Sequence, residues 1–184
     1  TPKPSSAASD VYKRQPISPN NEDKWIFEER ELIRNLIQQN KPIFGICFGA
    51  QQITKALGYT VGKSPVKEVG WDKVYLESSI IPNIPKALIA LHWHEETFHI
   101  PKNAQLLFSS QYLKNQGFIL NNNIIGLQFH FEPGAHEIKE IVMNDASYTF
   151  DSVLNQTPEQ ILNQEVPKEN KEVMFKLLNF ITCH

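Results

Sequence analysis

The sequence is poor in cysteine and shows no excess of either charge. Its 184 residues include only two cysteines, Cys47 in an apolar segment and Cys183 beside the C-terminal residue, so neither a disulfide framework nor a CxxC metal motif is present. The 18 basic and 20 acidic side chains leave a net charge of −2. This balance argues against a nucleic-acid or membrane partner.

Long hydrophobic runs are missing as well. The longest apolar segments, such as residues 44–47 and 87–91, are far shorter than the roughly 20 residues of a membrane-spanning helix. No signal-peptide pattern opens the chain. The length suits one domain with an ordinary core, and we expect a cytoplasmic protein.

The first 15 residues differ in composition from the rest. They are small and polar and show no periodicity, as in a disordered leader. Residues 5–15, SSAASDVYKRQ, resemble the in-frame translation of a common sequencing adaptor, so we expect residues 1–15 to be foreign to the fold. A natural flexible tail is the alternative. On the first interpretation the domain covers residues 16–184 and lacks its first strands.

Hydrophobic periodicity predicts an α/β domain. A helical pattern starts at Trp25, the continuous apolar run 42–46 follows, and helical spacing returns over residues 49–57. A helix, a buried strand and a helix in this order favour a parallel sheet. Later strands, expected to add an antiparallel extension, and later helices are predicted over residues 68–76, 87–91, 105–109, 117–120 and 124–129, and over 135–142, from Pro158, and over 171–181.

Cys47 lies between the buried strand and the second helix, in the stretch FGICFGAQQ. A side chain at a sharp strand-to-helix turn is lifted out of the sheet, as in a nucleophile elbow. Gly45 and Gly49 leave room for a strained backbone and an approaching substrate. The positive end of the helix favours a thiolate. A buried core cysteine is the alternative on these grounds alone.

A candidate base lies in the stretch GLQFHFEP. His130 follows the apolar strand 124–129, and a parallel neighbour would bring it to the same sheet edge as Cys47. Glu132 would project to the same side and orient the imidazole. The three residues predict a Cys-His-Glu triad. Without Cys47, a core histidine beside a solvated glutamate would be the simpler interpretation.

These motifs resemble the class I, triad-type glutamine amidotransferases. The pattern G-x-C-x-G-x-Q over residues 45–51 and the stretch QFHFE over residues 128–132 carry the resemblance, together with EVGW at 68–71 and HWHEETF at 92–98. Small stand-alone proteins similar to the amidotransferase domain of GMP synthase are the most similar. The resemblance implies a three-layer open α/β sheet of flavodoxin-like type and no cofactor.

The resemblance also implies roles for the triad. Cys47 would attack the side-chain amide of glutamine, and His130 would protonate the leaving ammonia and later activate water. Glu132 would orient His130. The backbone N–H of Phe48 would be one donor of the oxyanion hole. Relatives place the second donor in a Gly-Gly-Pro turn, where this chain has Arg14-Gln15 before Pro16.

Two further positions would bind the substrate. Gln51 matches a position that helps bind glutamine, and Glu96 matches an acid that receives the α-amino group of the substrate. That acid is usually aspartate, so the longer Glu96 would also suit another γ-glutamyl substrate; a solvated surface acid is the alternative. Phe131 replaces a common proline of the family.

A histidine-rich segment raises the question of a metal. His92, His94 and His99 include a His-x-His pair, which places two imidazoles on one side of a strand. Because no third ligand at characteristic spacing is evident, we expect no metal. Trp93 and Phe98 are expected to pack rather than to stack on bases.

The sequence therefore predicts a glutamine amidotransferase that supplies ammonia to an acceptor synthetase partner. A γ-glutamyl peptidase or hydrolase with the same triad is the first alternative. A catalytically inactive regulatory module of the same fold is the second.

Overall fold

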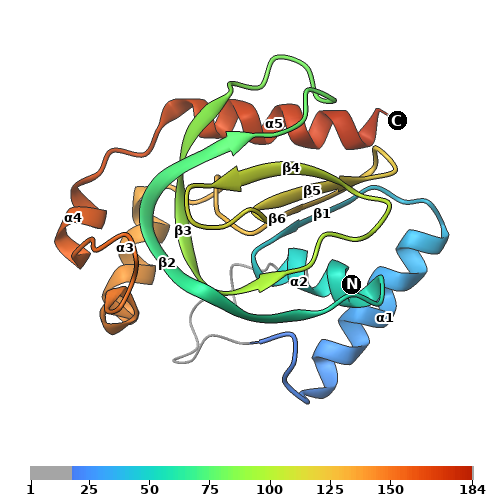
Figure 1. The fold of residues 1–184 in the computed structure, drawn as a ribbon, viewed down its shortest axis with the longest axis horizontal. Coiled ribbons are helices and arrows are strands. Elements are labelled where there is room, and N and C mark those ends of the chain that lie inside the picture. The colour runs from blue at the N-terminus through green and yellow to red at the C-terminus, as the bar shows by residue number, and fades with distance from the viewer. Residues whose placement is uncertain (1–17, 184) are drawn as a thin grey trace.

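The computed structural model describes residues 18–183, which fold around one six-stranded sheet (Figure 1). The strands are β1 (Ile43–Ile46), β2 (Val61–Leu76), β3 (Ala87–Phe98), β4 (Gln105–Ser110), β5 (Gly117–Leu120) and β6 (Ile124–Leu127). Their order across the sheet is β1-β6-β5-β4-β2-β3. β1 and β6 run parallel, whereas the other neighbouring strands pair antiparallel. The predicted parallel neighbour of the Cys47 strand and the antiparallel extension are thus confirmed.

Helices cover both faces of this sheet. They are α1 (Lys24–Gln38), α2 (Phe48–Ala56), α3 (Ala135–Asn144), the 3₁₀ turn η2 (Ala146–Thr149), α4 (Pro158–Asn163) and α5 (Lys168–Thr182). Figure 1 shows α5 along one side of the sheet and α1 and α2 on the other. Val173, Leu177 and Ile181 of α5 pack into one apolar core, and Ile33 and Ile53 of α1 and α2 pack into a second. The three-layer α/β arrangement is therefore confirmed.

β2 and β3 are longer than the sequence pattern predicts. Residues 68–76 and 87–91 are only parts of these strands, which pair from Val61–Phe98 to Tyr75–Ala87 with an irregularity between Lys63 and Glu68. In Figure 1 the two strands form a long ribbon that curls around the sheet. The segment 61–67 contains a glycine and a proline, which weaken a strand pattern, and long-range pairing overrides that local signal.

The last third of the chain packs against the curled ribbon. Ile138, Val142 and Ile161 of α3 and α4 form a third apolar cluster with Trp71 and Leu91 of β2 and β3. The helix predicted to start at Pro158 is present as α4, with a capping box between Thr157 and Gln160.

Two further observations concern the chain as a whole. No helix among residues 18–183 is long and apolar enough to cross a membrane. The leader predicted over residues 1–15 lies outside the described residues.

Candidate active site

Cys47 occupies the sharp turn that connects β1 to α2. Its backbone has φ 50° and ψ −110°, a strained conformation for a residue other than glycine. The Cys47 N–H donates to the carbonyl oxygen of Leu127 at 2.7 Å, which fixes the turn to the end of β6. The predicted nucleophile elbow is therefore present at the carboxyl end of the parallel pair.

The two glycines beside Cys47 have different surroundings. A Cβ atom at Gly45 would lie 2.6 Å from Ile53 Cδ1 and 2.7 Å from the backbone of Gly49, so Gly45 lets α2 pack closely on β1. A Cβ atom at Gly49 would meet nothing within 4 Å. Close packing therefore requires glycine at the first position, while the second faces open space.

His130 reaches the same sheet edge from β6. Ile46 pairs with Leu127 in the parallel register, so both chains leave the sheet at one level. Beyond β6, His130 is fixed by two backbone hydrogen bonds with Leu91 of β3, at 2.8 and 3.2 Å. Its Nδ1 lies 2.5 Å from Glu132 Oε1. The fold thus brings the three predicted triad residues together, with the imidazole held on two sides.

The charges of this group support one another. Burial lowers the pKa of His130, but the Glu132 carboxylate and the hydrogen bond to Cys47 outweigh burial and hold it well above its ordinary value of 6.5. Burial raises the pKa of Glu132, and the attraction of His130 brings it below the ordinary value. The arrangement favours an imidazolium between a carboxylate and the Cys47 sulfur.

A cavity of about 210 Å³ opens in front of Cys47. One wall comes from the turn and the start of α2, and the opposite wall comes from β2, β3 and η2. The lining residues used below are Cys47, Phe48, Gln51, Lys63, Trp93, His94, Glu96 and Tyr148. Because the nucleophile lines this cavity, a substrate held there would meet the sulfur directly.

Buried amides stand behind the nucleophile. The Nε2 of Gln51 donates to Gln128 Oε1 at 3.3 Å, and the Nε2 of Gln128 lies 3.6 Å from the Cys47 sulfur. Both glutamines are at least 97% buried. Gln51 therefore lies where the resemblance expects it. Gln128 was visible in the sequence motif, but the contact with sulfur depends on the parallel register.

Phe48 and Glu96 also lie at the cavity. Phe48 is the first residue of α2, where a helix leaves its N–H groups without intrahelical partners. The position of the second oxyanion donor falls on Arg14-Gln15, outside the described residues. Glu96 accepts a hydrogen bond from Ser18 Oγ at 2.8 Å. Glu96 is a cavity-lining acid, not the solvated surface acid of the alternative interpretation.

Sequence analysis missed two cavity residues. Lys63 lies opposite Glu96 in the β2–β3 register, so the cavity offers a cation and an anion side by side. Tyr148 comes from η2, and burial together with the neighbouring acids raises the pKa of its phenol. No local pattern marks either residue, because β2 begins irregularly and η2 is a single short turn.

The other predicted positions have mixed outcomes. Phe98 is buried and packs edge-to-face on Phe118, as expected, while Trp93 packs on Tyr148 and also lines the cavity. Phe131 is a core residue stacked against Phe129, so the replacement of proline adds apolar packing. His99 bonds to Thr60 at 2.7 Å.

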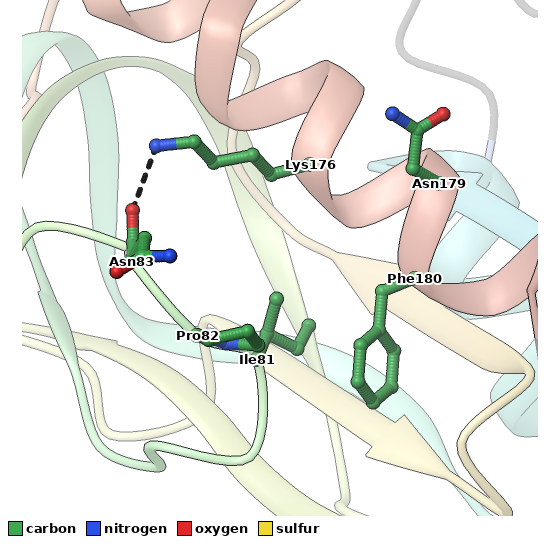
Figure 2. Close-up of a pocket in the computed structure, with 6 residues that line it drawn as sticks. All are labelled: Ile81, Pro82, Asn83, Lys176, Asn179 and Phe180. Carbon is green, nitrogen blue, oxygen red and sulfur yellow. Dashed lines mark hydrogen bonds between the residues drawn. The ribbon is translucent and has the colours of Figure 1, made fainter.

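A second cavity of about 310 Å³ lies between the β2–β3 connection and α5 (Figure 2). Lys176 Nζ donates to the carbonyl oxygen of Asn83 at 2.8 Å across it. Its lining residues are Ile81, Pro82, Asn83, Lys176, Asn179 and Phe180. Because these residues include neither a nucleophile nor an acid, the cavity at Cys47 is the candidate for catalysis.

Residues 16–148 match the model of the family described as glutamine amidotransferase class-I. The chain belongs to this family. A glutamine amidotransferase of Thermotoga maritima with a known crystal structure superposes with a TM-score of 0.76 at 28% identity, covering 91% of this chain and 73% of that one. The family explains why the elbow and the His-x-Glu segment meet at one edge of the sheet.

Relatives of this amidotransferase-family chain differ in their named activities. It is 35% identical over 127 residues to a glutamine-hydrolysing GMP synthase subunit from Sulfolobus acidocaldarius, covering 66% of this chain and 65% of the relative. It is 30% identical over 120 residues to gamma-glutamyl peptidase 4 of Arabidopsis thaliana, covering 59% and 47%. The chain spans about half the length of several curated relatives that it matches. Family membership therefore leaves the substrate to be argued from the site.

Proposed function

We propose that the protein hydrolyses the side-chain amide of glutamine through a cysteinyl thioester and releases ammonia. The observation that carries this proposal is the placement of Cys47 on a strained turn, beside an imidazole whose Nδ1 contacts Glu132 at 2.5 Å. A thiolate and an imidazolium in one cavity supply the nucleophile and the acid that amide cleavage needs. Membership in the class I family supports the same chemistry.

The first half-reaction forms the thioester. The Cys47 sulfur attacks the side-chain carbonyl carbon, and the C–S bond forms as the carbonyl oxygen gains negative charge. The N–H of Phe48, at the start of α2, points its dipole at that oxygen. His130 then donates its proton to the amide nitrogen, the C–N bond breaks, and ammonia leaves.

The second half-reaction restores the enzyme. His130, now neutral, takes a proton from water, and the water oxygen attacks the thioester carbon. The C–S bond breaks, glutamate leaves, and Cys47 returns as the thiolate beside a protonated His130. Glu132 keeps its contact with Nδ1 throughout, so it holds the ring with Nε2 free for the proton.

The far wall of the cavity suits the amino-acid end of the substrate. Glu96 would receive the α-amino group, and Lys63, opposite it in the β2–β3 register, would meet the α-carboxylate. Gln51 lies on the near wall, within hydrogen-bond reach of Gln128. A charged pair at one end and a nucleophile at the other would select a γ-glutamyl group.

A γ-glutamyl peptidase or hydrolase is the second candidate. Glu96 is one methylene longer than the usual aspartate of the family, and the aromatic rings of Trp93 and Tyr148, 5.7 Å apart at their centroids, line the same cavity. Apolar walls suit a larger group on the γ-nitrogen than hydrogen. The similarity to a gamma-glutamyl peptidase points the same way.

One assay separates these functions. The purified full-length gene product is supplied with glutamine and with γ-glutamyl peptides, and ammonia and free amino acids are measured. Ammonia from glutamine supports the amidotransferase, and peptide cleavage supports the second candidate. Cys47→Ala removes either activity, whereas Cys183→Ala, which changes an exposed thiol near the C-terminus, leaves it intact. Activity that survives Cys47→Ala contradicts both proposals.

A partner and a location complete the proposal. An ammonia-releasing protein serves biosynthesis only when an acceptor synthetase uses the ammonia, and the similarity to a GMP synthase subunit supports such a partner. We propose that both act in the cytoplasm.

A further inference from the structure

Three buried side chains that the proposed reaction does not use converge in the curled ribbon. Glu68 comes from β2, and His92 and His94 come from β3. Each is at least 97% buried, and one ligand atom from each lies within 4.8 Å of the others. This group, the Glu68–His92–His94 cluster, combines one carboxylate with two imidazoles.

Strand pairing makes the cluster. Glu68 lies directly opposite His94 in the antiparallel register, and His92 is two residues before His94 on the same face of β3. The missing third ligand of the histidine segment is therefore Glu68, 24 and 26 residues earlier in the chain. His99 does not belong, because its ring bonds to Thr60.

The spacing suits a small divalent ion. Glu68 Oε2 lies 3.3 Å from His94 Nε2 and 3.7 Å from His92 Nδ1. A tetrahedral Zn²⁺ with ligand distances of about 2.0–2.2 Å holds its donor atoms roughly 3.3–3.6 Å apart. The side chains thus already stand at ligand spacing, and a fourth position would be left for water.

The histidine rings lack ordinary partners. Among residues 18–183, both nitrogens of His92 and of His94 are buried and make no hydrogen bond of normal geometry. Unpaired buried polar atoms cost free energy, and four of them beside one carboxylate are uncommon in a folded core. A metal ion would satisfy one nitrogen of each ring and the carboxylate charge together.

Neighbouring side chains orient the carboxylate. Ser110 Oγ donates to Glu68 Oε1 at 2.7 Å, and Gln116 Nε2 donates to Glu68 Oε2 at 2.5 Å. Both partners are buried. Hydrogen-bonded carboxylates of this kind are typical of metal sites, where outer groups hold the ligand in place.

We propose that Glu68, His92 and His94 bind one divalent transition-metal ion of the Zn²⁺ type. Two imidazoles and a carboxylate suit Zn²⁺ better than Mg²⁺ or Ca²⁺, which prefer oxygen ligands. His94 also lines the cavity in front of Cys47, which provides a route for the ion. The ion would tie β2 to β3 behind the cavity, so its main effect would be on stability.

The test uses Cys47→Ala protein, because a cysteine and His130 in the active site also attract zinc. After chelator treatment, Zn²⁺ is titrated calorimetrically and thermal unfolding is measured with and without it. One ion per chain and a higher Tm with Zn²⁺ are expected. Co²⁺ should give a spectrum of nitrogen and oxygen ligation. Absence of saturable binding, or binding without an increase in Tm, overturns the proposal.

Matched variants locate the ion. In the Cys47→Ala background, Glu68→Gln and His94→Gln should each weaken Zn²⁺ binding by at least about 100-fold, whereas His99→Ala should not. Circular dichroism identifies a variant that fails to fold, and the other then carries the test. Unchanged binding in a folded Glu68→Gln or His94→Gln protein, or loss of binding in His99→Ala, overturns the assignment.

Discussion

Cys47 combines a reactive side chain with a backbone conformation that ordinary residues avoid. Its positive φ is held by the Leu127 hydrogen bond on one side and by the first turn of α2 on the other. The resulting strain aims the sulfur out of the sheet, toward His130. His130 is in turn positioned by Glu132, so each residue of the triad depends on the next.

Glu132→Gln should impair catalysis without removing a ligand of the substrate. The amide keeps the shape but removes the charge that raises the pKa of His130, so the imidazolium becomes less stable. We expect ammonia release to fall by about 10²–10⁴-fold, with a smaller change in KM. Steady-state kinetics test this, and a change confined to KM would contradict the role of Glu132 as a positioning residue.

The same pair predicts a pH dependence of stability. The pKa of His130 is raised, so its contribution is complete below its ordinary value of 6.5 and is lost as pH rises through the folded-state value. The pKa of Glu132 is lowered, so its contribution is complete above its ordinary value of 4.5 and is lost as pH falls through the folded-state value.

The stability difference between wild type and Glu132→Gln should therefore be largest between pH 4.5 and 6.5. It should shrink toward both higher and lower pH. Denaturant unfolding across this range measures the difference. A difference that is independent of pH would show that the pair is not ionised in the folded state.

The strand β1, the turn and the helix α2 form one packed unit. Gly45 permits this packing, because its missing side chain leaves space for Ile53 and for the backbone of α2. Ala50 and Ile53 then bury the inner face of the helix. Close contact between strand and helix sets the position of the Cys47 turn relative to β6.

Gly45→Ala should destabilise the protein by about 1–3 kcal/mol, because the new methyl group would press on α2 backbone atoms less than 3 Å away. Gly49→Ala is the matched control: it adds the same group where nothing lies within 4 Å and should be neutral or stabilising by up to about 1 kcal/mol. Chemical denaturation compares the two. Equal effects would contradict this account of the packing.

The whole molecule is held together by segments that lie far apart in the sequence. The chain after α3 returns to β2, where the Gln156 amide accepts from Trp71 N–H at 2.8 Å and donates to Trp71 O at 2.7 Å. Ser152 makes the same kind of double contact with the backbone of Val69. These side chains cover a stretch of β2 whose other edge pairs with β3.

Gln156→Ala should cost about 1–3 kcal/mol, because it leaves both backbone groups of Trp71 without these partners. Gln164→Ala removes the same amide from an exposed site and should change stability little. Hydrogen exchange at the Trp71 amide gives a local measure, with faster exchange expected only in the first variant. Similar exchange in both would contradict the bridging role.

The outer helix α5 closes one face of the sheet. Leu177 is fully buried there, and Leu177→Ala should destabilise the fold by about 2–5 kcal/mol through the cavity that it leaves. Phe175 on the same helix is 54% exposed, so Phe175→Ala should cost much less. Thermal unfolding of the two variants tests whether α5 is integral to the fold. Equal losses would contradict the burial pattern.

Helices and the first strand were predictable because their signals are local. The pattern from Trp25 and the apolar run 42–46 each gave an element within a few residues of its observed bounds, since helical spacing and continuous apolar burial need no distant partner. The extra lengths of β2 and β3 were not predicted. Their strand character comes from pairing with each other across a long connection.

The candidate site divides in the same way. Cys47, His130, Glu132, Gln51 and Glu96 stand in motifs that name them, but Lys63 and Tyr148 carry no local signal, and their place at the cavity follows from β-strand register and from the return of the chain after α3. Composition and motif alone were enough to indicate a cysteine-based amidotransferase fold. Folding placed Glu68 opposite His94 and turned an isolated His-x-His segment into a three-ligand cluster, because antiparallel pairing joins residues that no sequence spacing connects.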